Sequence, residues 1–201
     1  MHATERDTPR VRDARCQHVE AIATRRDVHR FYFLDETGVR LDYCRHYGRA
    51  AGSQRVGQAV PLRRGRALTL IGVLGVRGLT AVQLLDGALN QHNFAFYVGR
   101  VLGPQLRRGD VLVLDNLAVH KLGGLPEALA VRGVQLLFLP PYSPDFTPVE
   151  QAWSKLKTIL RQAQARTREA LEAAIQTALQ WITRDDATAW FNHCGYHVHR
   201  S

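Results

Sequence analysis

The sequence contains little cysteine, which excludes a fold held together by a framework of disulfide bonds. Its three cysteines, Cys16, Cys44 and Cys194, are odd in number, and no Cys-x-x-Cys pair occurs. Disulfides persist in oxidising compartments, whereas free thiols are usual in the reducing cytosol. We therefore expect a cytoplasmic protein.

Long apolar runs and several enzyme motifs are also missing. No stretch approaches the roughly 20 apolar residues that a membrane helix requires. Residues 1–15 are charged and lack the apolar core of a signal peptide. The chain has neither a Gly-x-x-x-x-Gly-Lys-Ser/Thr phosphate loop nor a Gly-x-Ser-x-Gly nucleophile motif. These absences argue against a membrane protein, a P-loop nucleotidase and a serine hydrolase of that type.

Negative charge is scarce relative to positive charge. The 201 residues include 27 Lys and Arg against 18 Asp and Glu, which gives a formal charge of +9, and 45% of the residues are apolar. This apolar content is enough for one domain with a full core. A basic surface suits a polyanionic partner such as nucleic acid. The alternative is an arginine-rich composition that merely reflects a GC-rich genome.

Apolar patterning predicts an initial run of strands followed by strands that alternate with helices. The expected strands are 30–35, 67–76, 79–85, 111–115 and 135–139. The expected helices are 12–24, 90–106, 122–131, 149–164 and 168–182, and segment 42–66 is expected to be a loop or a poorly ordered strand. This order implies an α/β fold in which an antiparallel meander is extended by parallel strands and covered by helices.

Three acidic residues stand where buried apolar segments meet turns. Asp35 ends the run 31–34, Asp115 ends the run 111–114, and Glu150 opens a helix after a proline-rich loop. Carboxylates at the carboxyl ends of strands point into the crevice where α/β sheets bind ligands. Three converging carboxylates repel one another unless cations hold them, and hard oxygen ligands suit Mg²⁺ or Mn²⁺. The pattern indicates metal-assisted phosphoryl transfer.

Each acidic residue also has a purely structural interpretation. Asp35 is placed to cap a turn before Gly38, and Asp115 is placed to cap a turn or the next helix. Glu150 fits a capping box in which Thr147 is the N-cap. The neighbouring Glu36 should point to the opposite face of the strand, so we do not include it among the metal ligands.

Basic side chains recur on the helix that Glu150 opens. Lys155, Lys157 and Arg161 lie on a face next to the apolar stripe and are candidates for contacts with phosphate groups. The alternative is an ordinary solvated helix face.

Taken together, four segments resemble the DDE transposases, and in particular the bacterial insertion-sequence transposases related to the mariner superfamily. The segments are Phe33-Leu34-Asp35-Glu36-Thr37, Val113-Leu114-Asp115-Asn116, His120-Lys121, and Leu139-Pro140-Pro141-Tyr142-Ser143-Pro144-Asp145 leading to Pro148-Val149-Glu150. Thirty-four residues separate Asp115 from Glu150, which matches the short second spacing of that superfamily. The resemblance covers roughly residues 30–196.

The resemblance implies a ribonuclease H-like, retroviral-integrase-like catalytic domain at 30–196, with an N-terminal arm at 1–29 and a C-terminal tail at 197–201. It implies that Asp35, Asp115 and Glu150 are catalytic and bind two Mg²⁺ or Mn²⁺ ions. Asn116 and His120 match positions that support the second Asp, where they would orient phosphate or water. The candidate DNA contacts are Lys121, Lys155, Lys157 and Arg161.

The implied activity is DNA cleavage at transposon ends followed by strand transfer into target DNA. The alternatives are a ribonuclease H-like nuclease that cuts without joining and a catalytically idle remnant that still binds DNA. The implied partners are double-stranded DNA and a second copy of the chain in a homodimer, acting at the nucleoid. Full-length relatives carry helix-turn-helix modules ahead of the catalytic domain, so a separate DNA-binding half is a further expected partner.

Overall fold

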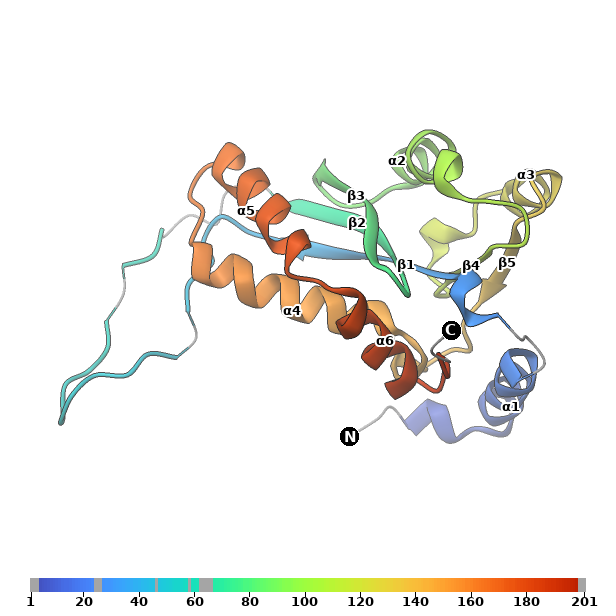
Figure 1. The fold of residues 1–201 in the computed structure, drawn as a ribbon, viewed down its shortest axis with the longest axis horizontal. Coiled ribbons are helices and arrows are strands. Elements are labelled where there is room, and N and C mark those ends of the chain that lie inside the picture. Colours follow the sequence, from blue (N-terminus) through green and yellow to red (C-terminus); the bar gives the residue numbers. More distant parts are fainter. Residues whose placement is uncertain (1–3, 24–26, 46, 58, 62–66, 199–201) are drawn as a thin grey trace.

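A five-stranded mixed sheet forms the centre of the computed structural model, which describes residues 4–23, 27–45, 47–57, 59–61 and 67–198. The strands are β1 (Phe31–Val39), β2 (Leu68–Gly75), β3 (Gly78–Asp86), β4 (Val111–Leu114) and β5 (Gln135–Phe138). Their order across the sheet is β3-β2-β1-β4-β5 (Figure 1). β1, β2 and β3 pair antiparallel, whereas β4 and β5 are added parallel to β1. The predicted meander with parallel additions is therefore confirmed.

Six α-helices surround this sheet in the described part of the chain. They are α1 (Pro9–Ala23), α2 (Gln91–Phe96), α3 (Leu125–Val131), α4 (Pro148–Ala163), α5 (Arg168–Gln180) and α6 (Arg184–His193). The helix expected at 90–106 changes pitch, because α2 continues as a π-helical segment, Tyr97–Leu102, and a 3-10 turn, Gly103–Gln105. Further 3-10 turns are Thr4–Asp7, Val28–Arg30, Ala118–His120 and Pro144–Phe146.

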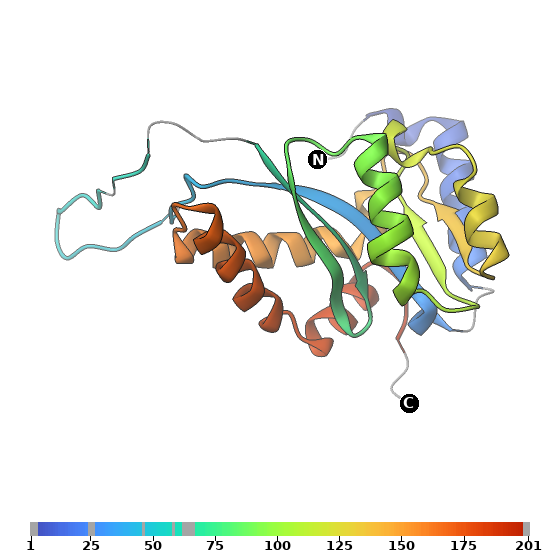
Figure 2. The same cartoon turned by 90° about the horizontal axis from the view of Figure 1, so that it is seen from above.

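Side-chain alternation along the strands divides the core into two layers. Phe31 and Phe33 of β1 pack with buried residues of α4, α5 and α6, whereas Leu34 packs with residues of α2 and α3. Figures 1 and 2 show these two helix groups on opposite sides of the sheet. Successive residues of a strand point to opposite faces, so Asp35 lies on the α4 side and Glu36 on the α2 side.

The helix α6 was not predicted, because its sequence buries few apolar residues. Only Ala187 and Phe191 of this helix are fully buried, which is too few for a readable periodic pattern. Its start is nevertheless well specified. Thr183 and Asp186 form a capping box, in which each side chain bonds the backbone N–H of the other residue.

Two peripheral segments were predicted only in outline. The N-terminal helix begins at Pro9, three residues before the expected start, and Val11 within it is completely buried. The described parts of segment 42–66 contain neither helix nor strand, which favours the loop over the poorly ordered strand, and Figure 1 shows them extending away from the sheet. Residues 62–66 and 199–201 lie outside the described residues. Among the helices described, none combines the length and apolarity needed to cross a bilayer.

Candidate active site

The strand register brings the two predicted aspartates to the same edge of the sheet. Phe33 of β1 is aligned with Val113 of β4 in the parallel pair, so Asp35 and Asp115, each two residues further on, lie at the same level. Glu150 lies in the first turn of α4, the helix that packs against β1. The structure therefore brings all three predicted carboxylates to one region.

The three carboxylates influence one another's ionisation. Burial, followed by repulsion from Glu36, Asp115 and Glu150, raises the pKa of Asp35 from 3.8 to about 7. Burial and the charge of Asp115 also raise the pKa of Glu150. Among the described residues, however, no three His, Cys, Asp or Glu side chains are close enough together to hold a metal ion. The carboxylates are near one another but do not form a closed set of ligands.

A cavity of about 400 Å³ joins two of the three carboxylates to basic side chains. Asp35 and Glu150 line it together with Lys157 and Arg161. Burial and the neighbouring Arg161 lower the pKa of Lys157, although Asp35 opposes this effect. Asp115 is not part of the cavity wall. The cavity thus combines acidic oxygen ligands with cationic groups, which is the combination needed beside a phosphodiester.

The indole of Trp153 forms part of this cavity wall, and a glycine makes room for it. Gly72 is the β2 partner of Asp35, and a Cβ atom at Gly72 would lie 3.1 Å from the Trp153 ring and 3.0 Å from Val82. A β-bulge in the β2–β3 pair accompanies this glycine, and Ala81 in the bulge has a φ of 52°. The buried indole N–H of Trp153 has no hydrogen-bond acceptor among the described residues.

His120 connects Asp115 to a residue that the sequence analysis set aside. Its Nδ1 lies 2.6 Å from Asp115 Oδ1 and its Nε2 lies 3.1 Å from Glu36 Oε2. Burial opposes protonation of His120, but the hydrogen bonds with Asp115 and Glu36 raise its pKa to about 9. Burial likewise opposes ionisation of Asp115, but its hydrogen bonds with His120 and the Leu117 N–H lower its pKa. Glu36 is therefore a site residue that was missed.

The sequence contained only half of the signal for this contact. Strand alternation predicted that Glu36 points away from Asp35, and it does. The partner that Glu36 meets on that face could not be read from the strand. It is His120, 84 residues further along the chain, which the 3-10 turn Ala118–His120 places there.

Asn116 and Lys121 flank this turn but have different surroundings. The side-chain amide of Asn116 donates a hydrogen bond to the carbonyl of Leu139, which connects the end of β4 to the start of the proline-rich loop. Lys121 is exposed just after the 3-10 turn. Asn116 thus has a structural bond, and Lys121 is accessible to a ligand.

The predicted row of basic residues on α4 is divided between two surfaces. Lys157 and Arg161 face the cavity, and the Arg161 guanidinium also lies 5.6 Å from the centre of the Tyr43 ring. Lys155 instead bonds Asp186 of α6 at 2.6 Å. The three side chains therefore do not form a single row.

The predicted capping box at the start of α4 is absent. Thr147 occupies the N-cap position, but its side chain makes no capping bond, and its hydroxyl donates to the carbonyl of Ser143 at 3.4 Å. Its φ of −116° and ψ of 83° differ from the usual extended N-cap geometry. Consequently the Glu150 carboxylate is not held by a capping box.

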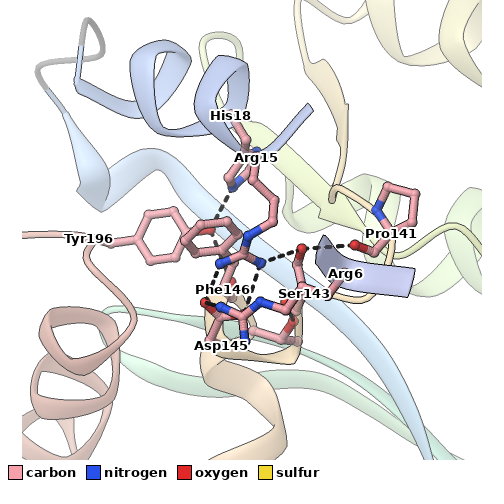
Figure 3. A network of polar contacts seen from close by, with 9 residues as sticks. Arg6, Arg15, His18, Pro141, Ser143, Asp145, Phe146 and Tyr196 are labelled. Atoms are coloured by element: carbon pink, nitrogen blue, oxygen red, sulfur yellow. Dashed lines mark hydrogen bonds and ion pairs between the residues drawn. The ribbon is translucent and has the colours of Figure 1, made fainter. Parts of the chain in front are cut away.

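The N-terminal helix instead stabilises the loop before α4 (Figure 3). Both terminal nitrogens of Arg15 donate to the carboxylate of Asp145, at 3.0 and 2.6 Å, and one also donates to the Ser143 hydroxyl at 2.6 Å. The Arg15 guanidinium lies 4.4 Å from the centre of the Phe146 ring. Arg6 adds a further bond to Asp145 at 3.1 Å. These contacts fix the segment 143–146, and Glu150 follows four residues after Phe146.

The other side of the same loop is held by the C-terminal segment. The Tyr196 hydroxyl donates to the carbonyl of Phe146 at 3.0 Å and lies 3.0 Å from Nε2 of His18 in α1. Tyr196 is completely buried among the aromatic rings of the core. Both ends of the described chain therefore converge on the loop that positions Glu150 (Figure 3).

Comparison with solved structures defines the fold class. The chain superimposes on the catalytic domain of Mos1 mariner transposase with a TM-score of 0.67 at 13% identity, covering 97% of this chain and 90% of that one. It also matches the Mos1 strand transfer complex (TM-score 0.69, 16% identity, 97% and 59% coverage) and the Mos1 paired end complex with Mg (0.70, 15%, 97% and 62%). This chain thus spans about 60% of the length of the proteins in those complexes. The predicted ribonuclease H-like fold is confirmed.

Comparison of sequences identifies the family. The profile described as DDE superfamily endonuclease matches residues 30–172, well over half of the chain. The protein belongs to this family, and the predicted DDE relationship is confirmed. A search of curated protein sequences gave no significant match.

Proposed function

We propose that this chain is the catalytic domain of a DNA transposase that cuts DNA at transposon ends and joins the cut ends to target DNA. The observation that supports the proposal most directly is the grouping of Asp35, Asp115 and Glu150 beside a cavity lined by Lys157 and Arg161, in a DDE-family fold. Strand transfer complexes are among the Mos1 structures that share this fold.

The three carboxylates fit divalent metal ions by their chemistry. They offer only hard oxygen atoms, which suit Mg²⁺ or Mn²⁺. A bound cation would offset both the burial and the repulsion between carboxylates that raise the pKa of Asp35. Mos1 complexes contain Mg or Mn. We propose Asp35, Asp115 and Glu150 as the residues that hold two such ions. With the ions bound, the chemistry supplied is activation of the attacking oxygen and stabilisation of the leaving oxygen.

The remaining residues have supporting roles in this proposal. Lys157 and Arg161 attract the phosphodiester into the cavity and offset its charge. Protonated His120 donates to Asp115 and Glu36 and fixes the direction of the Asp115 carboxylate. Asn116 maintains the end of β4, and exposed Lys121 contacts the DNA backbone beside it. Lys155, which pairs with Asp186, serves the packing of α6 rather than DNA.

The proposed partners are double-stranded DNA, a second copy of the chain and a helix-turn-helix unit that recognises the transposon ends. The paired end complexes of Mos1 bring transposon ends together, and a homodimer would supply one catalytic site for each end. The extra length of the Mos1 proteins in these complexes leaves room for DNA-binding modules of the kind that the resemblance implies.

A strand-transfer assay tests the proposal. Duplexes that carry the DNA flanking the gene are incubated with the protein, Mn²⁺ and a supercoiled plasmid, and joined and nicked products are scored separately. Joined products that disappear with Asp115→Asn, but persist with the control Glu127→Gln at an exposed position of α3, support a transposase. Nicks alone would favour the nuclease. DNA binding without any reaction that depends on Asp115 would favour the idle remnant.

A further inference from the structure

A second cavity lies away from the three carboxylates. It measures about 680 Å³ and is formed where the amino ends of β1 and β4 meet the β2–β3 hairpin and the start of α6. Phe31 begins β1 at this end, whereas Asp35 lies four residues further along the same strand. At about 3.3 Å per residue, the two positions are about 13 Å apart. The two cavities have no lining residue in common.

Arginines dominate the charge of this second cavity, which we call the hairpin cavity. Its lining includes Arg30, Arg77, Arg107 and Arg184, against the carboxylates of Asp27 and Asp110. Both carboxylates are already engaged by Arg30, at 3.5 Å and 3.3 Å respectively. The buried Asp110 also accepts a hydrogen bond from the backbone N–H of Arg107 at 2.7 Å. Acidic groups in the cavity are therefore satisfied locally.

Three of the four arginines are not paired with a carboxylate in the described part of the chain and are available to bind another partner. Within the described ranges, Arg77, Arg107 and Arg184 form no ion pair with a carboxylate. They come from three separate elements: the hairpin turn, the loop before β4, and the first residue of α6. Three unpaired guanidinium groups around one hollow give it a net positive charge, which favours an anionic ligand.

A tyrosine ring forms the wall that these arginines face. A Cβ atom on Gly75 would lie 3.1 Å from Tyr32, so the ring lies directly against the backbone of the hairpin. Tyr32 lines the cavity together with Arg30, Arg77 and Arg107. Burial and the charge of Asp110 raise the pKa of Tyr32, although these arginines oppose the effect, so its hydroxyl stays neutral. A neutral hydroxyl among arginines offers an additional hydrogen-bond donor to an anion.

We propose that the hairpin cavity binds the phosphate backbone of a DNA segment other than the one at the catalytic carboxylates. Guanidinium groups bind phosphate oxygens in pairs of parallel hydrogen bonds. Arginines spread over three elements match successive phosphates along a backbone better than one small ion. The proposal shares with the proposed function the assumption that DNA is the substrate, but it does not depend on any catalytic step.

The test compares two variants that lose the same charge. Arg77→Gln/Arg107→Gln removes two arginines of the cavity, and Arg10→Gln/Arg100→Gln removes two exposed arginines elsewhere. Affinity for a 30-base-pair duplex of arbitrary sequence is measured in EDTA over a range of salt concentrations. The cavity variant should bind at least about tenfold more weakly at low salt, and the slope of log K against log salt should become shallower by about 2. The control variant should change affinity less than about threefold.

Further arms separate the possible outcomes. Circular dichroism and melting temperature verify that each variant folds. If the double variant does not fold, the test is repeated with the single variant Arg184→Gln, at the exposed start of α6. Inorganic phosphate tests whether the cavity binds a small free anion or the phosphate groups of a DNA backbone. If phosphate stabilises the wild type but not the cavity variant, while duplex affinity is equal in both, the site takes a small anion and the DNA proposal is wrong.

The proposed function and the hairpin cavity can fail independently. If no variant shows cleavage, yet the cavity variant still loses DNA affinity, the cavity proposal holds and the transposase proposal fails. If cleavage depends on Asp115 while duplex affinity is the same for the cavity and control variants, the cavity proposal is overturned.

Discussion

The Nδ1 atom of His120 lies 2.6 Å from a carboxylate oxygen of Asp115. The other ring nitrogen faces Glu36 at 3.1 Å, and the ring itself is completely buried against Phe94. A doubly protonated imidazole can donate to both carboxylates at once, so the ion pair holds Asp115 in one orientation. The site thus has a fixed aspartate in Asp115, whereas burial and neighbouring carboxylates raise the pKa of both Asp35 and Glu150.

The first prediction concerns the titration of His120. Burial works against its protonation, but the two carboxylates raise its pKa to about 9, compared with 6.5 when free. Because the folded-state pKa is higher, its stabilising effect is complete below about pH 6.5 and is lost as the pH rises through 9. NMR of labelled imidazoles should give a midpoint near 9 in the wild type. Glu36→Gln should lower that midpoint by about one pH unit.

A His120 midpoint near 6.5 in the wild type would contradict the bridged arrangement.

The second prediction is that Asp35 destabilises the metal-free protein at alkaline pH. Burial and three neighbouring carboxylates raise its pKa from 3.8 to about 7, so the folded state binds more protons than the unfolded state between these values. Stability must therefore fall as the pH rises from about 4 to 7. The full shift corresponds to about 4 kcal/mol, and solvent contact reduces it to about 2 kcal/mol. Urea unfolding in EDTA should show Asp35→Asn to be the more stable protein at pH 8.

The difference between the two proteins should vanish near pH 4, where the native carboxyl is already neutral. Equal stabilities at pH 8 would show that Asp35 is not strained by its neighbours.

The third prediction is that divalent metal stabilises the wild type through the same carboxylates. A ligand that binds only the folded state at a concentration of about 100 times its Kd adds about 2.7 kcal/mol. For a protein of this size, that corresponds to a rise in Tm of about 5–10 °C. Differential scanning fluorimetry with Mn²⁺ should show this rise for the wild type and for Glu127→Gln. Asp115→Asn and Glu150→Gln should lose most of it, and an equal rise in all four proteins would contradict the proposed ligands.

Much of the fold could be predicted because its signals are local. The four-residue apolar runs before Asp35 and Asp115 mark strands buried on both faces, and the stripe Val149, Trp153, Leu156 and Leu160 is buried in α4 as the helical spacing requires. The resemblance that identified the family rests on the same segments, which carry both the strand ends and the acidic residues.

The remaining features depended on contacts between distant parts of the chain. Lys155 was grouped with Lys157 because the spacing on α4 allows it, but its direction is set by Asp186 in a helix whose few apolar residues give no periodic signal. In the same way, Glu36 belongs to the site only because it contacts His120. The loop before Glu150 is held by Arg15 rather than by its own capping residue. Polar contacts of this kind leave no periodicity in the sequence.

The fourth prediction concerns the contact between Arg15 and Asp145. Charged hydrogen bonds of this type contribute about 1.5–3 kcal/mol, and the 40% exposure of the Asp145 side chain reduces this to about 1–2 kcal/mol. Arg15→Ala should lower the free energy of unfolding by this amount. It should also weaken the stabilisation by Mn²⁺, because the loop that positions Glu150 loosens. The matched control is Arg12→Ala on the same helix. The Arg12 side chain is 68% exposed, and its ion pair with Asp7 is long, at 3.9 Å.

A double-mutant cycle with Asp145→Ala isolates the contact. A coupling energy near zero would mean that Arg15 acts only through its packing on Phe146. Arg15→Lys should fall between the wild type and Arg15→Ala, since an ammonium group keeps the charge but cannot bind both carboxylate oxygens in parallel.

The fifth prediction tests whether the absence of a side chain at Gly72 shapes the catalytic cavity. An added Cβ atom would lie 3.0 Å from Val82 and 3.1 Å from Trp153, so Gly72→Ala must displace the partly buried Val82 or the buried Trp153. Overpacking of this kind costs about 1–3 kcal/mol. Gly38→Ala in neighbouring β1 is the matched control, because its new Cβ would meet no atom within 4 Å. The control should be neutral or slightly stabilising, since alanine restricts the unfolded chain more than glycine does.

Tryptophan fluorescence in Gly72→Ala should differ from that of the wild type if the indole at the cavity moves, and metal binding should weaken because Trp153 lies beside Asp35 and Glu150. If the fluorescence and the stability of Gly72→Ala equal those of Gly38→Ala, Val82 absorbs the added methyl group instead. The close approach of Trp153 to the sheet would then not be required for the shape of the site.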